Sequence, residues 1–473
     1  MALVLLCLSA CDSEVNPEGG GGAGGEGGEG GEGAAGGEGA AGGEGGVGPV
    51  VCEATPREPE DGCLTAACEV VLDTDFTCDD FEVAAPGVRV AASADATWLV
   101  TSTSNAAVVY RVMGGVAERI DDELPLGYVR NTYSIATDSV GRLHLGVDAT
   151  LPGIDYDGGA EHAVFDGSSW TRTLVHDRED KYVSVMNLEI GAEDHPSVWV
   201  SDDAPDTCVI AQETQDGSFT NENAPTLPDA YGRRWFSLAT DERVVAFDVR
   251  NDVLHTLIDG DESPLGTPAI AGDYLVAHTP SPFADALGPA YAALLARQEG
   301  LSVIWPDGAG GWDEVQVPAS ARPTPTCPDL SGDECIGPCV ETSVGVEPRS
   351  FAIGRTTDGN LWVAFVSSTY DIALHYEEDC FEEGCYCNKL VDDDQSTFTL
   401  HLVKVDPSSG TTEEVYRVDT DRLALDDLFL DSFSNPRALD VRGFGSTLAI
   451  GVRTAGVSFG DGAVRLLRIE TAE

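Results

Sequence analysis

A short strand-like pattern of hydrophobic residues recurs along most of this chain. In each copy, three to five neighbouring residues are apolar with few polar interruptions, and polar or turn-forming residues flank them. A strand that is apolar on both faces has to be covered on both faces. Seven copies occur, at Trp98–Val100, Leu143–Val147, Val198–Val200, Val244–Phe247, Tyr274–Ala277, Leu361–Phe365 and Leu448–Val452.

A hairpin follows most of these repeats. Its tip is marked by Gly, Asp or Asn, which suit tight turns between antiparallel strands. Repeats of this kind build four-stranded sheets that pack face to face around a common axis. We therefore predict an all-β fold, a β-propeller of seven four-stranded blades. The tips fall at Gly114-Gly115, Asp166-Gly167, Asp216-Gly217, Asn251-Asp252, Asp307-Gly308 and Asp406–Gly410.

The spacing of the repeats agrees with blades that carry insertions. The first four copies are spaced as WD40 or kelch repeats are. The later gaps are longer and hold a predicted short helix at Pro289–Glu299, ended by Gly300. Two further insertions, at 322–346 and 371–395, carry cysteines. A pair of β-sandwiches is the alternative architecture, and regular spacing without a long linker favours the propeller.

One stretch resembles the blades of secreted bacterial β-propellers. The residues that carry the resemblance are Ser134–Asp138, Gly141–His144 and Phe165–Thr171. A shared fold does not imply a shared function. The resemblance therefore supports the architecture and implies no activity.

The last repeat unit holds strands at Thr447–Val452 and Ala463–Ile469, and the sequence then ends at Glu473 without an outer strand. An uncovered sheet edge invites aggregation. We therefore expect a segment from the front of the folded region, either Glu69–Leu72 or Phe81–Ala84, to pair there and bring the two ends of that region together.

The first residues have the pattern of a secretory signal. Residues 1–10 are almost wholly apolar and end in small residues, and they are too few to span a membrane, which takes about 20 residues. Leu8-Ser9-Ala10-Cys11 resembles the lipobox of bacterial lipoproteins, although no basic residue precedes it. The resemblance implies a diacylglycerol on Cys11 and a lipid-anchored protein of the bacterial cell envelope, on its periplasmic side or at the outer-membrane or extracellular face. An ordinary cleaved signal is the alternative.

A Gly-, Ala- and Glu-rich tract follows Cys11. It has hardly an apolar side chain to bury, so nothing offsets the entropy of ordering it. About 40 such residues form a flexible tether with a root-mean-square span of about 35 Å. We divide the chain into a lipoprotein signal peptide (1–10), the lipidated Cys with a disordered tether (11–51), a Cys-rich closing segment (52–80) and the propeller domain (81–473).

The chain has 13 cysteines, which suits an oxidising compartment. Their spacing fits no zinc knuckle and no His lies close to them, so we interpret them as disulfide-forming, with open connectivity. The four early cysteines are expected to pair locally, a bridge could join the two later triplets, and Cys208 would stay free. The candidates are Cys52, Cys63, Cys68, Cys78, Cys327, Cys335, Cys339, Cys380, Cys385 and Cys387.

The charge balance narrows the range of partners. There are 82 acidic and 26 basic residues, a formal net charge of −56. This charge excludes a general electrostatic attraction to nucleic acid or anionic lipid headgroups. The expected partners are an envelope or extracellular protein or a glycan, and contact with the membrane is expected through the lipid anchor only.

No motif predicts a catalytic centre. Gly456–Gly460 matches G-x-S-x-G but lacks a following helix and a later His, so we interpret it as a β-turn. His144 and His162 are expected to be structural. Arg233-Arg234-Trp235 is expected to form local ion pairs. The acidic, Cys-bearing segment between Glu377 and Asp394 is expected to be a loop held by disulfides. We predict no cofactor, apart from possible calcium on this loop or, more weakly, at Asp155–Gly158.

These observations favour a binding or scaffolding module for an extracellular or envelope protein or glycan. Its expected binding surface is the rim with the insertions at 280–300, 322–346 and 371–395. The alternative is a propeller-type polysaccharide hydrolase or lyase, which would need carboxylates or an aromatic pocket near the axis. A third possibility is a purely structural spacer. Because the repeats lack a reactive constellation, we do not predict an enzyme.

Overall fold

A computed structural model of the chain describes most of the region after residue 51. Cys11 and the tether lie outside the described residues, and so do Cys327 and Cys335. The described ranges are 52–58, 62–78, 88–103, 106–120, 133–149, 158–177, 183–191, 194–202, 208–214, 216–223, 233–238, 244–250, 253–258, 261–264, 274–276, 291–296, 300–307, 312–320, 338–356, 360–381, 384–421, 438–455 and 462–471.

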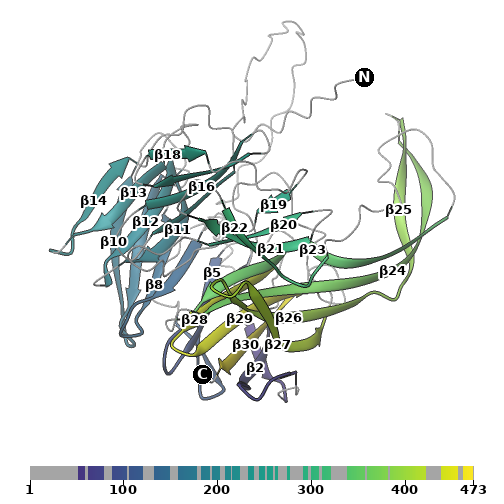
Figure 1. Cartoon of the computed structure of the whole chain (residues 1–473), viewed down its shortest axis with the longest axis horizontal. Helices are drawn as coiled ribbons and strands as arrows, with labels where there is room; N and C mark the ends of the chain where they lie inside the picture. Colours follow the sequence, from purple (N-terminus) through teal and green to yellow (C-terminus); the bar gives the residue numbers. More distant parts are fainter. Residues whose placement is uncertain are drawn as a thin grey trace, which may run out of the picture.

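The described chain forms a seven-bladed, all-β propeller of antiparallel sheets (Figure 1). The first blade contains β3 (Arg89–Ala92), β4 (Thr97–Thr103), β5 (Ala106–Met113) and β6 (Val116–Arg119). The second contains β7 (Tyr133–Thr137), β8 (Leu143–Ala149), β9 (Gly159–Phe165) and β10 (Trp170–Asp177). The third contains β11 (Val183–Ile190), β12 (Pro196–Asp202), β13 (Cys208–Glu213) and β14 (Phe219–Asn223).

The next three blades continue in sequence order. The fourth contains β15 (Arg233–Leu238), β16 (Val244–Arg250), β17 (Val253–Ile258) and β18 (Asp261–Pro264). The fifth contains β19 (Tyr274–Val276), β20 (Ala292–Ala296), β21 (Gly300–Pro306) and β22 (Trp312–Gln316). The sixth contains β23 (Cys339–Arg355), β24 (Leu361–Phe381), β26 (Thr397–Asp406) and β27 (Thr411–Thr420), with β25 (Gly384–Asp394) paired to β24.

The seventh blade joins the two ends of the folded region, as the sequence predicts. It contains β28 (Leu439–Phe444), β29 (Thr447–Ala455), β30 (Gly462–Thr471), β2 (Cys68–Cys78) and β1 (Cys52–Pro56). β2 pairs antiparallel with β30, with Val70 opposite Ile469. The expected pairing of Glu69–Leu72 is therefore confirmed, and the other candidate, Phe81–Ala84, lies outside the described residues.

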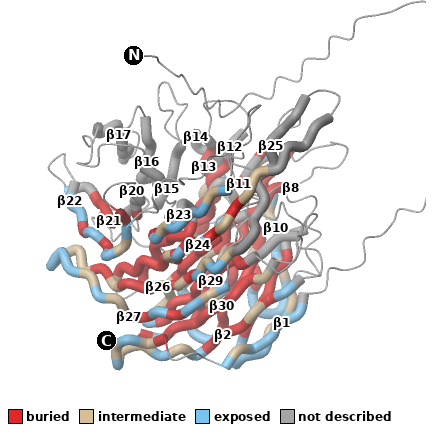
Figure 2. The backbone as a smooth tube through the Cα atoms, turned by 90° about the vertical axis from the view of Figure 1, so that its right-hand side faces the viewer, coloured by how far each residue is buried: buried red, intermediate tan, exposed pale blue. Residues whose placement is uncertain are grey.

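Blade packing explains the doubly apolar repeats. Alternate residues of one strand point to opposite faces of its sheet. On β4, Trp98 and Val100 pack against the second blade, whereas Leu99 packs against the seventh. Figure 2 shows the same result as long buried stretches along β24, β26, β29 and β30. The repeat on β4 is apolar on both faces because a neighbouring blade covers each face.

Two buried arginines reinforce the closing blade. Arg465 on β30 forms a fully buried ion pair with Asp73 on β2, with Nη2 and Oδ2 2.6 Å apart, and also donates to the carbonyl of Asp419 in the sixth blade. Arg468 donates to the carbonyl of Ala94 in the first blade. Removing one partner of a buried pair costs about 3–5 kcal/mol because the other charge is left uncompensated. The ion pair joins β30 to β2 within the seventh blade, and the hydrogen bonds to Asp419 and Ala94 link that blade to both of its neighbours.

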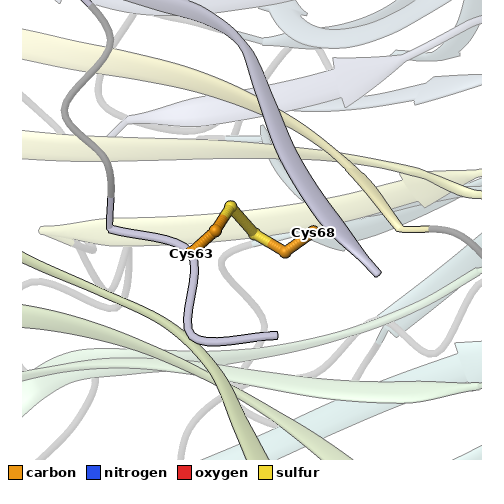
Figure 3. Close-up of a disulfide and its surroundings, with 2 residues drawn as sticks. All are labelled: Cys63 and Cys68. Carbon is orange, nitrogen blue, oxygen red and sulfur yellow. A yellow bond between two sulfur atoms is a disulfide. The ribbon is translucent and has the colours of Figure 1, made fainter. Parts of the chain in front are cut away.

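The segment before β2 also covers the outer edge of the sixth blade. Arg417 of β27 donates its backbone N–H to Gly62, and Leu64 donates to Val415. A Cβ on Gly62 would lie 2.5 Å from the carbonyl oxygen of Arg417, so glycine permits this close approach. A disulfide between Cys63 and Cys68 then links the edge segment to the start of β2 (Figure 3). It is one of the local pairings expected for the early cysteines.

The predicted helix at Pro289–Glu299 is wrong. Ala292–Ala296 forms β20, which pairs with both β19 and β21. Gly300 opens β21 at a φ of 95°, and a Cβ there would lie 2.2 Å from the carbonyl oxygen of Ala319. Helix propensity is a weak preference that tertiary packing overrides, and here the Ala- and Leu-rich segment supplies a strand to a blade.

One repeat also sits in a different position from the others. The six repeats other than Tyr274–Ala277 fall on the second strand of their blades, whereas Tyr274–Val276 forms β19, the first strand of the fifth. The described residues include no helix with the length and apolar character needed to cross a membrane.

Candidate functional site

The sixth blade extends beyond the length of an ordinary blade. β24 has 21 residues; its first half pairs with β26 as far as Thr369, and its second half pairs with β25 from Ile372 onward. β23 follows β24 on the other side as far as Leu374. We call residues 339–346 with 369–381 and 384–394 the arm. Figure 1 shows β25 and the end of β24 projecting away from the other blades.

The arm unites the two insertions that carry the later cysteines. Cys339 lies opposite Leu374, and Cys380 lies opposite Cys385 across β24 and β25. The acidic segment between Glu377 and Asp394 is therefore a β-hairpin and not the loop that we expected. The third rim insertion is different, because its described part supplies β20 to the fifth blade.

The two faces of the arm differ in burial. Tyr370, Ile372 and Leu374 alternate on one face and pack into the core between the sixth and seventh blades. The opposite face carries Val340 and Val344, which are 65% and 63% exposed. Thr342 lies between them, Thr369 and Asp371 lie opposite on β24, and all three are exposed. The arm thus anchors one face in the core and presents the other to solvent.

Cys339, at the start of β23 in the arm, is disulfide-bonded. Side chains at Cys380, Cys385 and Cys387 lie outside the description, as do those at Cys52 and Cys78, although the register places Cys52 directly opposite Cys78. Within the described part of the chain there is no cluster of His, Cys, Asp or Glu that could hold a metal ion. Calcium binding stays a prediction, since Asp155–Asp157 lies outside the described residues.

A second polar region lies where first strands of the blades meet. Asp440 on β28 accepts the backbone N–H of Val90 on β3 at 3.0 Å. Thr137 on β7 donates to the carbonyl of Ala92 on β3 at 2.6 Å. Ser134 on β7 donates to Asn187 on β11, also at 3.0 Å. These hydrogen bonds tie the seventh, first, second and third blades together in sequence around the axis.

The charges of this axial region are buried and compensated. Asn187 donates to Glu189 at 3.0 Å. Arg442 on β28 has a lowered pKa, chiefly because of its burial, while Asp440 and Glu189 oppose that shift. Asp440 lies 3.9 Å from the Nε of Arg442. Carboxylates that are buried and already hydrogen-bonded hold strands together, so these groups support ring closure.

The remaining sequence candidates have structural roles where they are described. His144 and His162 form a buried pair with Asp138, as expected for structural histidines. Asp166 accepts hydrogen bonds from Ser168 and Ser169 at a hairpin tip, which confirms the hairpin turn predicted at Asp166-Gly167. These hydrogen bonds lower the pKa of its carboxyl to about 2. Gly456–Gly460 lies outside the described residues. Arg233–Leu238 forms β15, but its side chains lie outside the described residues, so the ion pairs expected of Arg233 and Arg234 stay a prediction.

Comparison with known proteins adds little beyond the fold. The sequence matches no protein-family model and no curated protein. Among solved structures it is similar to a protein of unknown function from Dyadobacter fermentans (9% identity, 86% of this chain, 100% of that chain, TM-score 0.39). It is also similar to the polysaccharide lyase Uly1 (9% identity, 82% of this chain, 90% of that chain, TM-score 0.39). A third similar structure is a fucose-specific lectin from Aleuria aurantia (12% identity, 66% of this chain, 97% of that chain, TM-score 0.35). At these values the similarities assign no ligand or activity to this chain.

Proposed function

We propose that this protein is a binding or scaffolding module of the bacterial cell envelope, anchored through a lipid on Cys11 and a flexible tether. Its partner is an envelope or extracellular protein or a glycan, and its binding element is the arm of the sixth blade. The single observation that supports this proposal most strongly is the exposed strand face that carries Val340, Thr342 and Val344.

The arm has the properties of a recognition element. Two β-branched apolar residues four positions apart on the same strand face are exposed, whereas the opposite face is buried. An exposed strand with apolar residues is available for contact with another chain. A two-stranded hairpin alone is marginally stable in water, so anchorage in the sixth blade allows the hairpin to project in one orientation. Rigid presentation lowers the entropy cost of binding.

The axial region favours binding over polysaccharide cleavage. A hydrolase or lyase in the central depression would need accessible carboxylates there. The described axial carboxylates, Asp440 and Glu189, are buried and hydrogen-bonded within the propeller. The arm instead carries exposed Val340, Val344 and Asp371 on one face, so the arm is the better candidate for contact with a partner.

The test of the proposal uses a shortened arm. Because His375 lies opposite Leu390 in the β24–β25 register, residues 376–389 can be replaced by Asn-Gly, which forms a two-residue hairpin turn. Val344→Lys is a second variant, and Val140→Lys is its control at an exposed valine of the second blade. Proximity crosslinking on intact cells should recover a partner with the wild type and the control but not with the arm variants. Equal recovery with all four proteins would contradict the proposal.

The anchor is tested separately. Cys11→Ala should move the protein from the membrane fraction to the soluble fraction, because a single thioether-linked lipid site would be removed, while the folded propeller should stay unchanged by circular dichroism. If the variant stayed in the membrane fraction, the anchor on Cys11 would be ruled out, and the proposal for the arm would still be open to its own test.

A further inference from the structure

Three polar side chains on the sixth blade are arranged as a nucleophile, a base and an orienting acid. Ser367 lies on β24, His401 on β26 and Glu414 on β27. The Oγ of Ser367 is 2.7 Å from the Nε2 of His401, and the Nδ1 of His401 is 2.7 Å from Oε1 of Glu414. A hydroxyl on one imidazole nitrogen and a carboxylate on the other is the arrangement that activates a serine.

Strand register brings the three side chains to one face. Phe365 lies opposite His401, and Ser367 is two residues further along β24, so Ser367 and His401 are diagonal neighbours on the same face. Glu414 lies opposite Val403, two residues from His401, at a bulge in the β26–β27 pairing. The ring of His401 stacks on Phe365, with centroids 4.6 Å apart, which fixes the plane of the imidazole.

The hydrogen bonds also fix the proton positions. Arg417 donates from Nε to Glu414 at 2.9 Å, and its hydrogen bonds are the main cause of a lowered pKa at that carboxyl. An ionised Glu414 accepts the Nδ1 proton of His401, so Nε2 is left as the acceptor for the hydroxyl of Ser367. Burial lowers the pKa of His401 below its usual value, with Glu414 opposing that shift. The imidazole is therefore neutral at pH 7 and able to accept a proton.

The site is partly open to solvent. The side chain of His401 is 15% exposed and that of Glu414 is 23% exposed. Val346 lies opposite Ser367 on β23, and the register of β23 shifts immediately after it. Val346 and Phe365 are both apolar and buried, and the register places them on the same face as Ser367. These neighbours favour a small uncharged acyl group near Ser367.

We propose that Ser367 is a nucleophile for small carboxylic esters, with His401 as its general base and Glu414 as a positioning residue. Ser367 Oγ forms a bond to the ester carbonyl carbon while its proton passes to Nε2 of His401. The bond from that carbon to the alcohol oxygen then breaks, and the leaving alkoxide takes the proton from His401. Water repeats the sequence on the acyl-serine, which releases the carboxylic acid and restores the hydroxyl. This activity is independent of partner binding by the arm.

The first test asks whether wild-type Ser367 reacts. The folded protein is incubated with a fluorophosphonate probe, which phosphonylates activated serines with loss of fluoride, and the adduct is located by peptide mass spectrometry. p-Nitrophenyl acetate serves as the ester substrate. We expect an adduct on Ser367 and turnover of the ester. Absence of an adduct on Ser367 of the folded wild type would overturn the proposal without reference to any variant.

The second test separates catalysis from a structural hydrogen-bond network. Ser367→Ala should abolish labelling and ester turnover, and His401→Gln should slow both by at least about 100-fold, the range for loss of a general base. Ser368→Ala is the matched control, because its hydroxyl bonds to the carbonyl of Gly345 and faces away from His401. Circular dichroism checks that each variant is folded. Equal labelling of wild type and His401→Gln would also overturn the proposal.

The positioning role of Glu414 has a readout of its own. The wild-type labelling rate should rise with pH as His401 loses its proton, with a midpoint below the ordinary histidine pKa of about 6.5. Glu414→Gln removes the charge that stabilises the imidazolium, so the midpoint should move further down and the limiting rate should fall at least about tenfold. An unchanged pH profile in a folded Glu414→Gln protein would show that Glu414 does not act through His401.

Discussion

Two blades contain a histidine hydrogen-bonded to a carboxylate, and the two networks differ in what surrounds them. In the second blade, Asp138 contacts His144, which contacts His162 at 3.0 Å. The side chains of His144 and Asp138 are 3% and 0% exposed. In the sixth blade, Ser367, His401 and Glu414 form a network that is partly exposed. Similar chemical groups therefore serve packing where water is excluded and can serve chemistry where a reactant has access.

The carboxylates have different partners as well. Asp138 accepts backbone N–H groups from Val140 and Arg142 in addition to its contact with His144, so it fixes the turn between β7 and β8. Glu414 instead accepts side-chain donors, from His401 and Arg417. A carboxylate that accepts backbone hydrogen bonds stabilises the fold. A carboxylate that accepts a hydrogen bond from a histidine fixes the orientation and the proton position of that histidine.

The largest expected effect comes from the buried carboxylate. Asp138→Ala leaves the buried His144 without its carboxylate partner, and an unsatisfied buried group costs about 1–3 kcal/mol. The backbone N–H groups of Val140 and Arg142 also lose their acceptor at a partly exposed turn, and we expect a total decrease of about 3 kcal/mol in the free energy of unfolding. Urea denaturation measures it. Asp216→Ala, at an exposed hairpin tip, is the control and should have a much smaller effect. Equal losses would remove the distinction between the two kinds of aspartate.

The pH dependence of stability should follow from the second blade. Burial lowers the pKa of His162 to about 3, with the charge of His144 as a smaller cause. The unfolded chain binds a proton at this residue below about pH 6.5, whereas the folded chain does so only near pH 3. The unfolded state therefore binds more protons between these values, and the free energy of unfolding should fall by a few kcal/mol as the pH decreases from about 7 to 4.

A substitution sharpens this second prediction. His162→Gln removes the titrating group, so its stability should change less between pH 7 and 4, although the variant is less stable overall. The loss from Asp138, whose pKa is lowered to about 2 through hydrogen bonds that outweigh its burial, occurs at lower pH, from about 4 downward. Urea denaturation at pH 7, 5.5 and 4 separates the contribution of His162 from that of Asp138. If the free energy of unfolding changed equally with pH in the wild type and in His162→Gln, His162 would be excluded as the cause of the change.

The smallest effect on stability is expected in the sixth blade. Glu414→Gln keeps the shape of the side chain and leaves its partners partly solvated, so we expect a loss of less than about 1 kcal/mol. Glu118→Gln, which removes the charge of an exposed ion pair with Arg111, is the control and should behave alike. The two variants should differ in ester turnover instead, which only Glu414→Gln reduces. A loss of stability comparable to that of Asp138→Ala would indicate a structural network in both blades.

Much of the fold could be predicted because it depends on local patterns. The apolar repeats reveal the blades, and the two strands of the last unit indicate that a further strand closes it, for which Glu69–Leu72 was one of two candidates. The segment Ala292–Ala296 is the exception, since its Ala and Leu residues favour a helix in isolation. These residues form a strand because they pair with β19 and β21, and local helix propensity carries no information about such long-range pairing.

The sites were harder to predict for the same reason. Ser367, His401 and Glu414 are on three strands and have no characteristic spacing, so only the register of β24, β26 and β27 brings them together. The arm was expected as a rim insertion, but its dense acidic residues suggested a loop. The pairing of segments 339–346 and 384–394 with β24 depends on β24 continuing beyond the blade, which the sequence of one segment alone does not indicate.

The most direct test of the contrast between the two blades is the carbethoxylation of histidines in the folded protein by diethyl pyrocarbonate, located by peptide mass spectrometry. The exposures predict that His401 is modified, and that prior labelling of Ser367 slows its modification, while His144 and His162 react only after denaturation. Equal modification of all three histidines in the native protein would contradict the account.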